Sequence, residues 1–453
     1  MKRNYILLGL LLLQMSSCKK WLDVKSNIAD VTPTTLEDYQ ALADNDRTNN
    51  GGSSGLALVS SDNYYVTYTT WQARSAVERN SYVWASELYE GSSPAEWSKP
   101  FAVVNNANII LEGIAAIPVT PANTSAWNNT RGSALFMRAL SFFNLAQTFS
   151  PHYNKASANT DKGIPLRLKA DANDISVRAS VEETYQQILT DLKEAADLLP
   201  VSPAYQTRPG KAAAYGLLAK TYLIMGDYAQ SFTFSDKAIA VYNTLIDFNT
   251  LNAAATNPFP AYPGNKEIIY YISSSTYLIF QNANPITDSV LYQSYAANDL
   301  RKTIFYKLNN NLPQFRANYL GAVNGFFSGI ASNELYLIRA ESNARLGNTG
   351  AALTDLNTLL LKRWKTGTFV SFTAATPAEA LTKILTERRK ELPFTGSTRW
   401  EDLRRLNTDP LFAKTLTRQL NGVTYTLPPN DRRYTLPIPD EEIKLSGITQ
   451  NPR

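Results

Sequence analysis

The chain is poor in cysteine and histidine, with one of each among its 453 residues. A single cysteine excludes an internal disulfide framework, so the hydrophobic core must hold the fold together. No group of His, Cys, Asp and Glu has the spacing of a zinc site, and no EF-hand loop is present. We therefore expect neither a bound metal nor a cofactor.

Charged residues are also few, and the basic residues are interleaved with acidic ones. Charged residues make up 18% of the chain, the net charge is +5, and residues 387–391 (Glu-Arg-Arg-Lys-Glu) show how basic and acidic residues are mixed. A surface that follows nucleic-acid phosphates concentrates positive charge. The composition therefore argues against a nucleic acid partner.

Signals of catalysis are weak. Residues 51–55 match the nucleophile pattern G-x-S-x-G, but that chemistry needs a strand-turn-helix and a nearby histidine. The preceding residues are polar, and the only histidine, His152, follows Ser150-Pro151 in an expected loop. We predict that the protein is not an enzyme and has no catalytic residue.

The only long apolar run lies at the N-terminus. Lys2 and Arg3 precede the apolar stretch Tyr5–Leu13, and small residues lead to Cys18. The stretch is shorter than the roughly 20 residues that span a bilayer. The arrangement is typical of a secretory signal and resembles a bacterial lipoprotein signal. We predict a signal peptide at residues 1–17 and lipidation of Cys18, with more than one acyl chain giving a stable anchor.

Helical patterns dominate the rest of the chain. Ser180 and Glu183 form a capping box before an amphipathic stretch that ends at Pro200. Further helices are expected from Lys211 to the Gly226 turn and over residues 228–241. Residues 135–149 carry two apolar stripes, which predicts burial on both sides.

An internal repeat is visible in the helical pattern. Residues 219–226 and 340–347 share the frame Ala-x6-Gly, each between two expected helices. Small residues at these points suit tetratricopeptide-type helix pairs. The two frames are not separated by a multiple of about 34 residues, the length of that repeat. We therefore expect helix pairs separated by long loops instead of a regular solenoid.

An aromatic and polar stretch is the strongest candidate for a ligand site. Sugar rings stack on aromatic side chains, while Asn, Asp and Arg can bond their hydroxyl groups. An alternative is that these aromatics pack the first helices against the core, and Trp84 and Trp97 are the better candidates for that role. The predicted ligand-binding residues are Asp62, Asn63, Tyr64, Tyr65, Tyr68, Trp71 and Arg74.

Several short motifs in a fixed order resemble those of the SusD/RagB nutrient-binding lipoproteins of Bacteroidetes outer membranes. Each motif is weak alone, and the resemblance covers nearly the whole chain. The motifs are Cys18–Asp23, Arg131–Ala139, Gly163–Leu166, Lys211–Leu223, Glu334–Glu341, Glu387–Leu392, Arg399–Arg405, Leu436–Pro439 and Gln450–Pro452.

The resemblance implies a mostly helical fold, in which tetratricopeptide-like pairs form a right-handed superhelical scaffold with long loops and minor β-hairpins. It implies an N-terminal SusD-like region at 18–240 and a C-terminal RagB/SusD region at 241–453, intertwined in one fold. It also implies a lipid-anchored protein of the cell outer membrane, facing the exterior, that passes oligosaccharides to a SusC-like TonB-dependent transporter without catalysis. A peptide-binding member of the family and a helical-repeat assembly scaffold without a small ligand remain alternatives.

Overall fold

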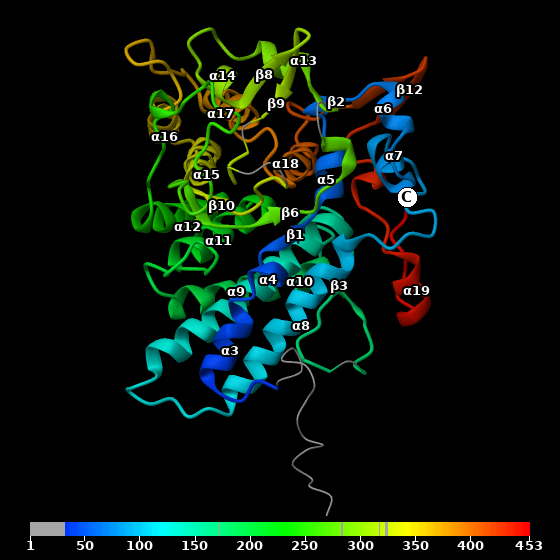
Figure 1. The fold of residues 1–453 in the computed structure, drawn as a ribbon, viewed down its shortest axis with the longest axis vertical. Helices are drawn as coiled ribbons and strands as arrows, with labels where there is room; N and C mark the ends of the chain where they lie inside the picture. Colours follow the sequence, from blue (N-terminus) through cyan, green and yellow to red (C-terminus); the bar gives the residue numbers. More distant parts are fainter. Residues whose placement is uncertain (1–31, 172, 282–283, 317, 322–324) are drawn as a thin grey trace, which may run out of the picture.

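Helices are the main secondary structure of the protein (Figure 1). The computed structural model describes residues 32–453 except 172, 282–283, 317 and 322–324. The predicted signal peptide and the predicted lipidation site, Cys18, lie outside the described residues. The helices are α3 (Leu36–Ala43), α4 (Asp46–Asn49), α5 (Gly55–Ser60), α6 (Tyr68–Gln72), α7 (Ala76–Tyr82), α8 (Ala95–Ala115), α9 (Thr124–Phe149), α10 (Val181–Leu198), α11 (Lys211–Met225), α12 (Tyr228–Val241), α13 (Ser289–Gln293), α14 (Arg301–Phe305), α15 (Ser332–Arg345), α16 (Thr349–Leu361), α17 (Pro377–Glu391), α18 (Thr398–Leu406) and α19 (Asp440–Ser446).

The ends of the helices follow the local signals in the sequence. The Ser180 side chain accepts a hydrogen bond from the Glu183 backbone, and the Glu183 carboxylate accepts one in return, so the predicted capping box opens α10. Gly226 ends α11 with a left-handed φ of 76°, a backbone conformation that costs glycine little. Asp227 then caps α12. The helices predicted in this part of the chain are confirmed.

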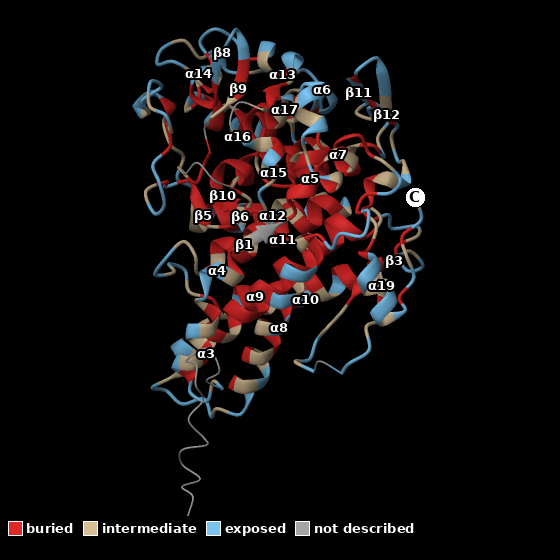
Figure 2. Ribbon diagram, turned by 45° about the vertical axis from the view of Figure 1, so that its right-hand side comes forward, coloured by how far each residue is buried: buried red, intermediate tan, exposed pale blue. Residues whose placement is uncertain are grey.

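Successive long helices pack against one another from α8 through α12 and continue with α15, α16 and α17. The second half of α9 is buried on all sides, with Phe136, Phe142 and Phe143 almost fully inaccessible, as its two apolar stripes predict. Figure 2 shows this buried layer running through the middle of the molecule. The predicted mostly helical class with tetratricopeptide-like pairs is confirmed.

Only short strands are present among the described residues, and each described sheet has two strands. They are β1 (Gly51–Ser53) with β6 (Ser273–Ser274), β2 (Tyr64–Tyr65) with β7 (Ile286–Thr287), β3 (Lys162–Pro165) with β4 (Arg178–Ser180), β5 (Ile268–Tyr270) with β10 (Ile330–Ala331), β8 (Tyr306–Asn309) with β9 (Leu312–Phe315), and β11 (Leu416–Leu420) with β12 (Val423–Leu427). Most pair antiparallel, while β1 and β6 are parallel. Three 3₁₀ turns, η3 (Phe248–Thr250), η4 (Leu278–Phe280) and η5 (Arg432–Tyr434), complete the described elements.

Buried ion pairs connect the C-terminal helices to the rest of the core. Arg388 on α17 bonds Glu334 on α15 and Asp402 on α18. Arg405 on α18 bonds Glu341 on α15. Because a buried charge is costly without a partner, these pairs fix how the three helices dock.

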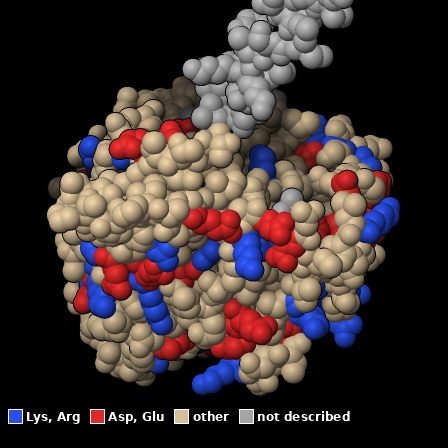
Figure 3. Space-filling view, turned by 90° about the horizontal axis from the view of Figure 1, so that it is seen from below, with Lys and Arg blue, Asp and Glu red and all other residues tan. Residues whose placement is uncertain are grey.

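Charged side chains of both signs lie on one face of the molecule. The face in Figure 3 shows the two signs side by side instead of a field of one sign. In the described part of the chain, no helix combines the length and apolar character needed to cross a bilayer.

Candidate ligand face

The predicted ligand stretch lies at the upper edge of the molecule in Figure 1, on β2 and α6. Strand β2 pairs with β7, which places Tyr65 opposite Ile286. The β8–β9 hairpin contacts β7, and α13 lies beside it in Figure 1. η4 joins the same edge, through a bond from Arg74 to Leu278 and a ring contact between Tyr64 and Phe280. Segments from distant parts of the sequence therefore form one surface, which we call the aromatic face.

Three aromatic side chains of the predicted set reach the surface. Tyr65 and Tyr68 are 40% and 37% exposed, and Trp71 is half-buried. Tyr68 and Trp71 are three residues apart on α6, so they share one side of the helix. Their rings are stacked, with centroids 5.7 Å apart and an interplanar angle of 29°.

Hydrogen bonds hold this pair in place. The Trp71 indole N–H donates to the Arg79 carbonyl at 3.1 Å, which fixes the ring against α7. Arg74 donates from Nε to the Thr70 carbonyl and from Nη1 to the Leu278 carbonyl. Since Leu278 belongs to η4, Arg74 joins α6 to its neighbour on the face.

The other three predicted residues point inward. The Asn63 side chain is fully buried; it donates to the Pro393 carbonyl and accepts a bond from Arg389. Tyr64 is 3% exposed and donates to the Val59 carbonyl. Both side chains already have partners within the chain and leave no surface for a ligand in this conformation.

Asp62 is held in a cluster of positive charge. Its carboxylate accepts hydrogen bonds from Arg399 at 2.6 and 2.9 Å and from Lys414 at 2.9 Å, and Arg389 lies 3.5 Å away. Burial opposes ionisation, but the charges of Arg399 and Arg389 hold the pKa of Asp62 well below its usual range. The geometry makes Asp62 a connection between the aromatic stretch and helices α17 and α18.

Burial separates the other tryptophans of this stretch from the face. Trp84 is 2% exposed and Trp97 is 6% exposed, as predicted for core residues. Aliphatic side chains that the sequence analysis did not single out are exposed on elements neighbouring the predicted aromatics. They are Leu278, Val290, Leu308 and Leu312.

Neither a metal site nor a catalytic group stands out here. No cluster of three His, Cys, Asp or Glu residues suited to a metal occurs in the described residues. His152 lies beyond the end of α9, far in sequence from β2 and α6, and burial lowers its pKa to about 3. The imidazole is therefore neutral at physiological pH.

Two family models match the chain in the places where the motifs lie. A model described as "Starch-binding associating with outer membrane" (SusD-like) matches residues 20–223, and the SusD family model (SusD/RagB) matches residues 333–453. The chain belongs to the SusD/RagB family.

Solved structures of SusD proteins share the fold over nearly the whole chain. A SusD superfamily protein from Bacteroides vulgatus ATCC 8482 is 23% identical, with a TM-score of 0.73 over 93% of this chain and 99% of that one. A relative from Bacteroides thetaiotaomicron VPI-5482 is 20% identical, with a TM-score of 0.70 over 92% of this chain and 100% of that one. A laminarin-binding SusD-like protein is 18% identical, with a TM-score of 0.61 over 91% of this chain and 97% of that one.

Among curated proteins, the SusD-like protein P2 of Formosa agariphila is similar over a shorter segment. It is 26% identical over 145 residues, which is 31% of this chain and 26% of that protein. The chain thus spans about a quarter of the length of this SusD relative.

Proposed function

We propose that this protein is a lipoprotein of the outer membrane that binds oligosaccharides at the aromatic face and delivers them to a SusC-like TonB-dependent transporter. Of the predicted ligand-binding residues, Asn63 and Tyr64 are buried, and the carboxylate of Asp62 is bonded by basic side chains. The proposed ligand contacts are therefore Tyr65, Tyr68, Trp71 and Arg74. The protein would act by binding and release, without catalysis.

The stacked pair of Tyr68 and Trp71 is the observation that carries this proposal. Two stacked aromatic rings at the surface form an apolar platform, and a sugar ring presents C–H groups that pack on such rings. Trp71 is fixed by its bond to Arg79, so little side-chain freedom is lost when a ligand binds. Arg74 lies one turn further along and can donate to a ligand hydroxyl.

Family membership supports the location and the ligand class. One matching model is described as starch-binding and associated with the outer membrane, and a structural relative is named as laminarin-binding. Cys18, in its lipoprotein-like context, would supply the anchor. The family resemblance supports the proposal of a transporter partner.

A peptide ligand is the main alternative, because aromatic rings also pack on peptide side chains. A scaffold that holds only a protein partner is the other. Titration calorimetry of the purified protein against glucan oligosaccharides and a peptide pool separates the three. Heat from a glycan alone supports the proposal. Heat from peptides alone contradicts it. The absence of heat from both glycans and peptides, while a transporter co-purifies with the protein, also contradicts it.

A further inference from the structure

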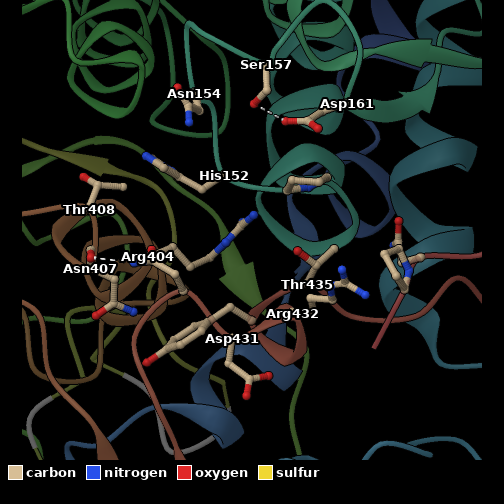
Figure 4. A pocket seen from close by; sticks show the side chains of 15 residues that line it. His152, Asn154, Ser157, Asp161, Arg404, Asn407, Thr408, Asp431, Arg432 and Thr435 are labelled. Carbon is tan, nitrogen blue, oxygen red and sulfur yellow. Dashed lines mark hydrogen bonds between the residues drawn. The ribbon is translucent and has the colours of Figure 1, made fainter.

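A cavity of about 250 Å³ is lined by residues outside the aromatic face, and Figure 4 shows it from close by. It is formed by the loop after α9, the C-terminal end of α18, and the chain around η5 and the C-terminus. None of the predicted ligand residues lines it. Its lining residues are Pro151, His152, Asn154, Ser157, Asp161, Arg404, Asn407, Thr408, Asn430, Asp431, Arg432, Tyr434, Thr435, Asn451 and Pro452.

Arg404 brings a buried positive charge to this cavity. Its terminal nitrogens donate to the carbonyls of Gln147 and Ser150 at the end of α9, and its Nε has no hydrogen-bond partner. Among the described residues, no carboxylate forms an ion pair with it, and burial lowers its pKa. Figure 4 shows the guanidinium end reaching in among the surrounding side chains, between His152 and Thr435. Its charge is therefore compensated only partly, by the carbonyl dipoles and by the charge of nearby Glu401.

Arg432 adds a second positive charge at the rim. Its side chain is exposed, and no hydrogen bond or ion pair to another described residue involves it. The neighbouring acid Asp431 is already neutralised, since Arg433 bonds both of its oxygens at 2.9 and 2.8 Å. Arg432 is thus free to bond an anionic group.

Hydroxyl-binding groups line the opposite side. Asp161 accepts one bond, from the Ser157 hydroxyl at 2.6 Å, on only one of its oxygens. The neutral ring of His152 makes no hydrogen bond within the described chain, and its Nδ1 is buried without a partner. A carboxylate and a neutral imidazole are groups that bond sugar hydroxyls.

We propose that this pocket binds a single sugar unit carrying a carboxylate, such as a uronic acid. The carboxylate of the sugar lies toward Arg432, in the field of Arg404, while its hydroxyls face Asp161 and His152. Of the charged side chains that line the pocket and form no ion pair with a described residue, two are positive (Arg404 and Arg432) and one is negative (Asp161). This excess of positive charge favours a ligand with one negative charge. This site extends the proposed function and does not depend on it.

Titration calorimetry with glucuronate, glucose and acetate, each at millimolar concentration, tests the pocket. Glucuronate is expected to bind at least about tenfold more tightly than glucose or acetate, because only it has both groups. Arg432→Ala is expected to weaken glucuronate binding about tenfold. Arg47→Ala removes an exposed arginine on α4, outside the cavity, and leaves binding unchanged.

Three results overturn the proposal: no heat with glucuronate, equal binding of glucose, or unchanged glucuronate binding by Arg432→Ala. Tyr68→Ala in the same titration distinguishes this site from the aromatic face. It is expected to leave glucuronate binding intact, and a loss there would assign the acidic sugar to the aromatic face instead.

Discussion

Arg399 bonds both oxygens of Asp62, at 2.6 and 2.9 Å, and so joins two segments 337 residues apart in sequence. The pair links the start of α18 to the turn before β2. The aromatic face therefore depends on the C-terminal region for its position. This relationship also separates residues that support the face from residues that can contact a ligand.

Asp62→Ala is expected to lower the free energy of unfolding by about 3 kcal/mol, because it leaves the largely buried Arg399 without its acid. Urea unfolding measures the loss. Lys414→Ala removes a half-exposed partner of the same acid and is expected to cost less than about 1 kcal/mol. A variant of Asp62 that keeps its stability but no longer binds the oligosaccharide would instead make Asp62 a ligand residue.

Gly113 on α8 is expected to tolerate no side chain. A Cβ there would lie 2.1 Å from the Tyr39 ring, which packs α3 against α8. Gly113→Ala is expected to cost about 1–3 kcal/mol through overpacking. Gly350→Ala on α16 is the matched control, since nothing lies within 4 Å, and it is expected to gain up to about 1 kcal/mol. Equal unfolding midpoints for the two variants would contradict the packing of α3.

Acid is expected to weaken the fold through Asp402. Burial opposes ionisation of this group, but the charges of Arg388 and Arg405 outweigh burial and lower its pKa to about 2, from 3.8. The unfolded chain thus takes up the proton first as the pH falls. The contribution, about 2 kcal/mol, is present above pH 4 and is lost as the pH falls through 2.

Guanidinium unfolding at pH 6, 4, 3 and 2 measures this dependence. Asp402→Asn should lower stability at pH 6 and flatten the profile between pH 4 and 2. Asp197→Asn, at an exposed carboxylate of α10, should leave the profile as it is. A variant at Asp402 with the same slope as the parent would show that other groups carry the acid sensitivity.

Replacement of Cys18 by alanine is expected to release the protein from the membrane, since no other cysteine can take its lipid. Cell fractionation, with detection of a bound acyl label, measures the change. Ser17→Ala keeps the cysteine and small residues before it, and should stay in the membrane fraction. Recovery of the alanine variant in membranes would mean that the anchor lies elsewhere.

Much of the fold could be predicted from the sequence because its signals are local. The capping box at Ser180 and the glycine at 226 specify helix ends by themselves, and the structure confirms both. The two apolar stripes of residues 135–149 likewise predicted the burial of α9. Periodicity and caps depend only on neighbours in sequence.

The candidate site was harder to predict, because adjacent residues of one stretch point in different directions. Tyr64 and Tyr65 are both aromatic, yet strand geometry turns one into the core and the other to the surface. Asp62 was predicted to contact the ligand because its partner Arg399 is distant in sequence, and the ion pair between them could not be predicted. The pocket near His152 could not be predicted from the sequence, since four separate chain segments form it.

Binding of an oligosaccharide at the aromatic face is the central claim, and calorimetry of a double variant tests it most directly. Tyr68→Ala with Trp71→Ala should weaken binding of the best ligand about a hundredfold, at about 1–3 kcal/mol for each lost aromatic contact. Tyr205→Ala, which removes an exposed aromatic elsewhere, should bind as the parent does. If the folded double variant binds the oligosaccharide as tightly as the parent, the account is wrong.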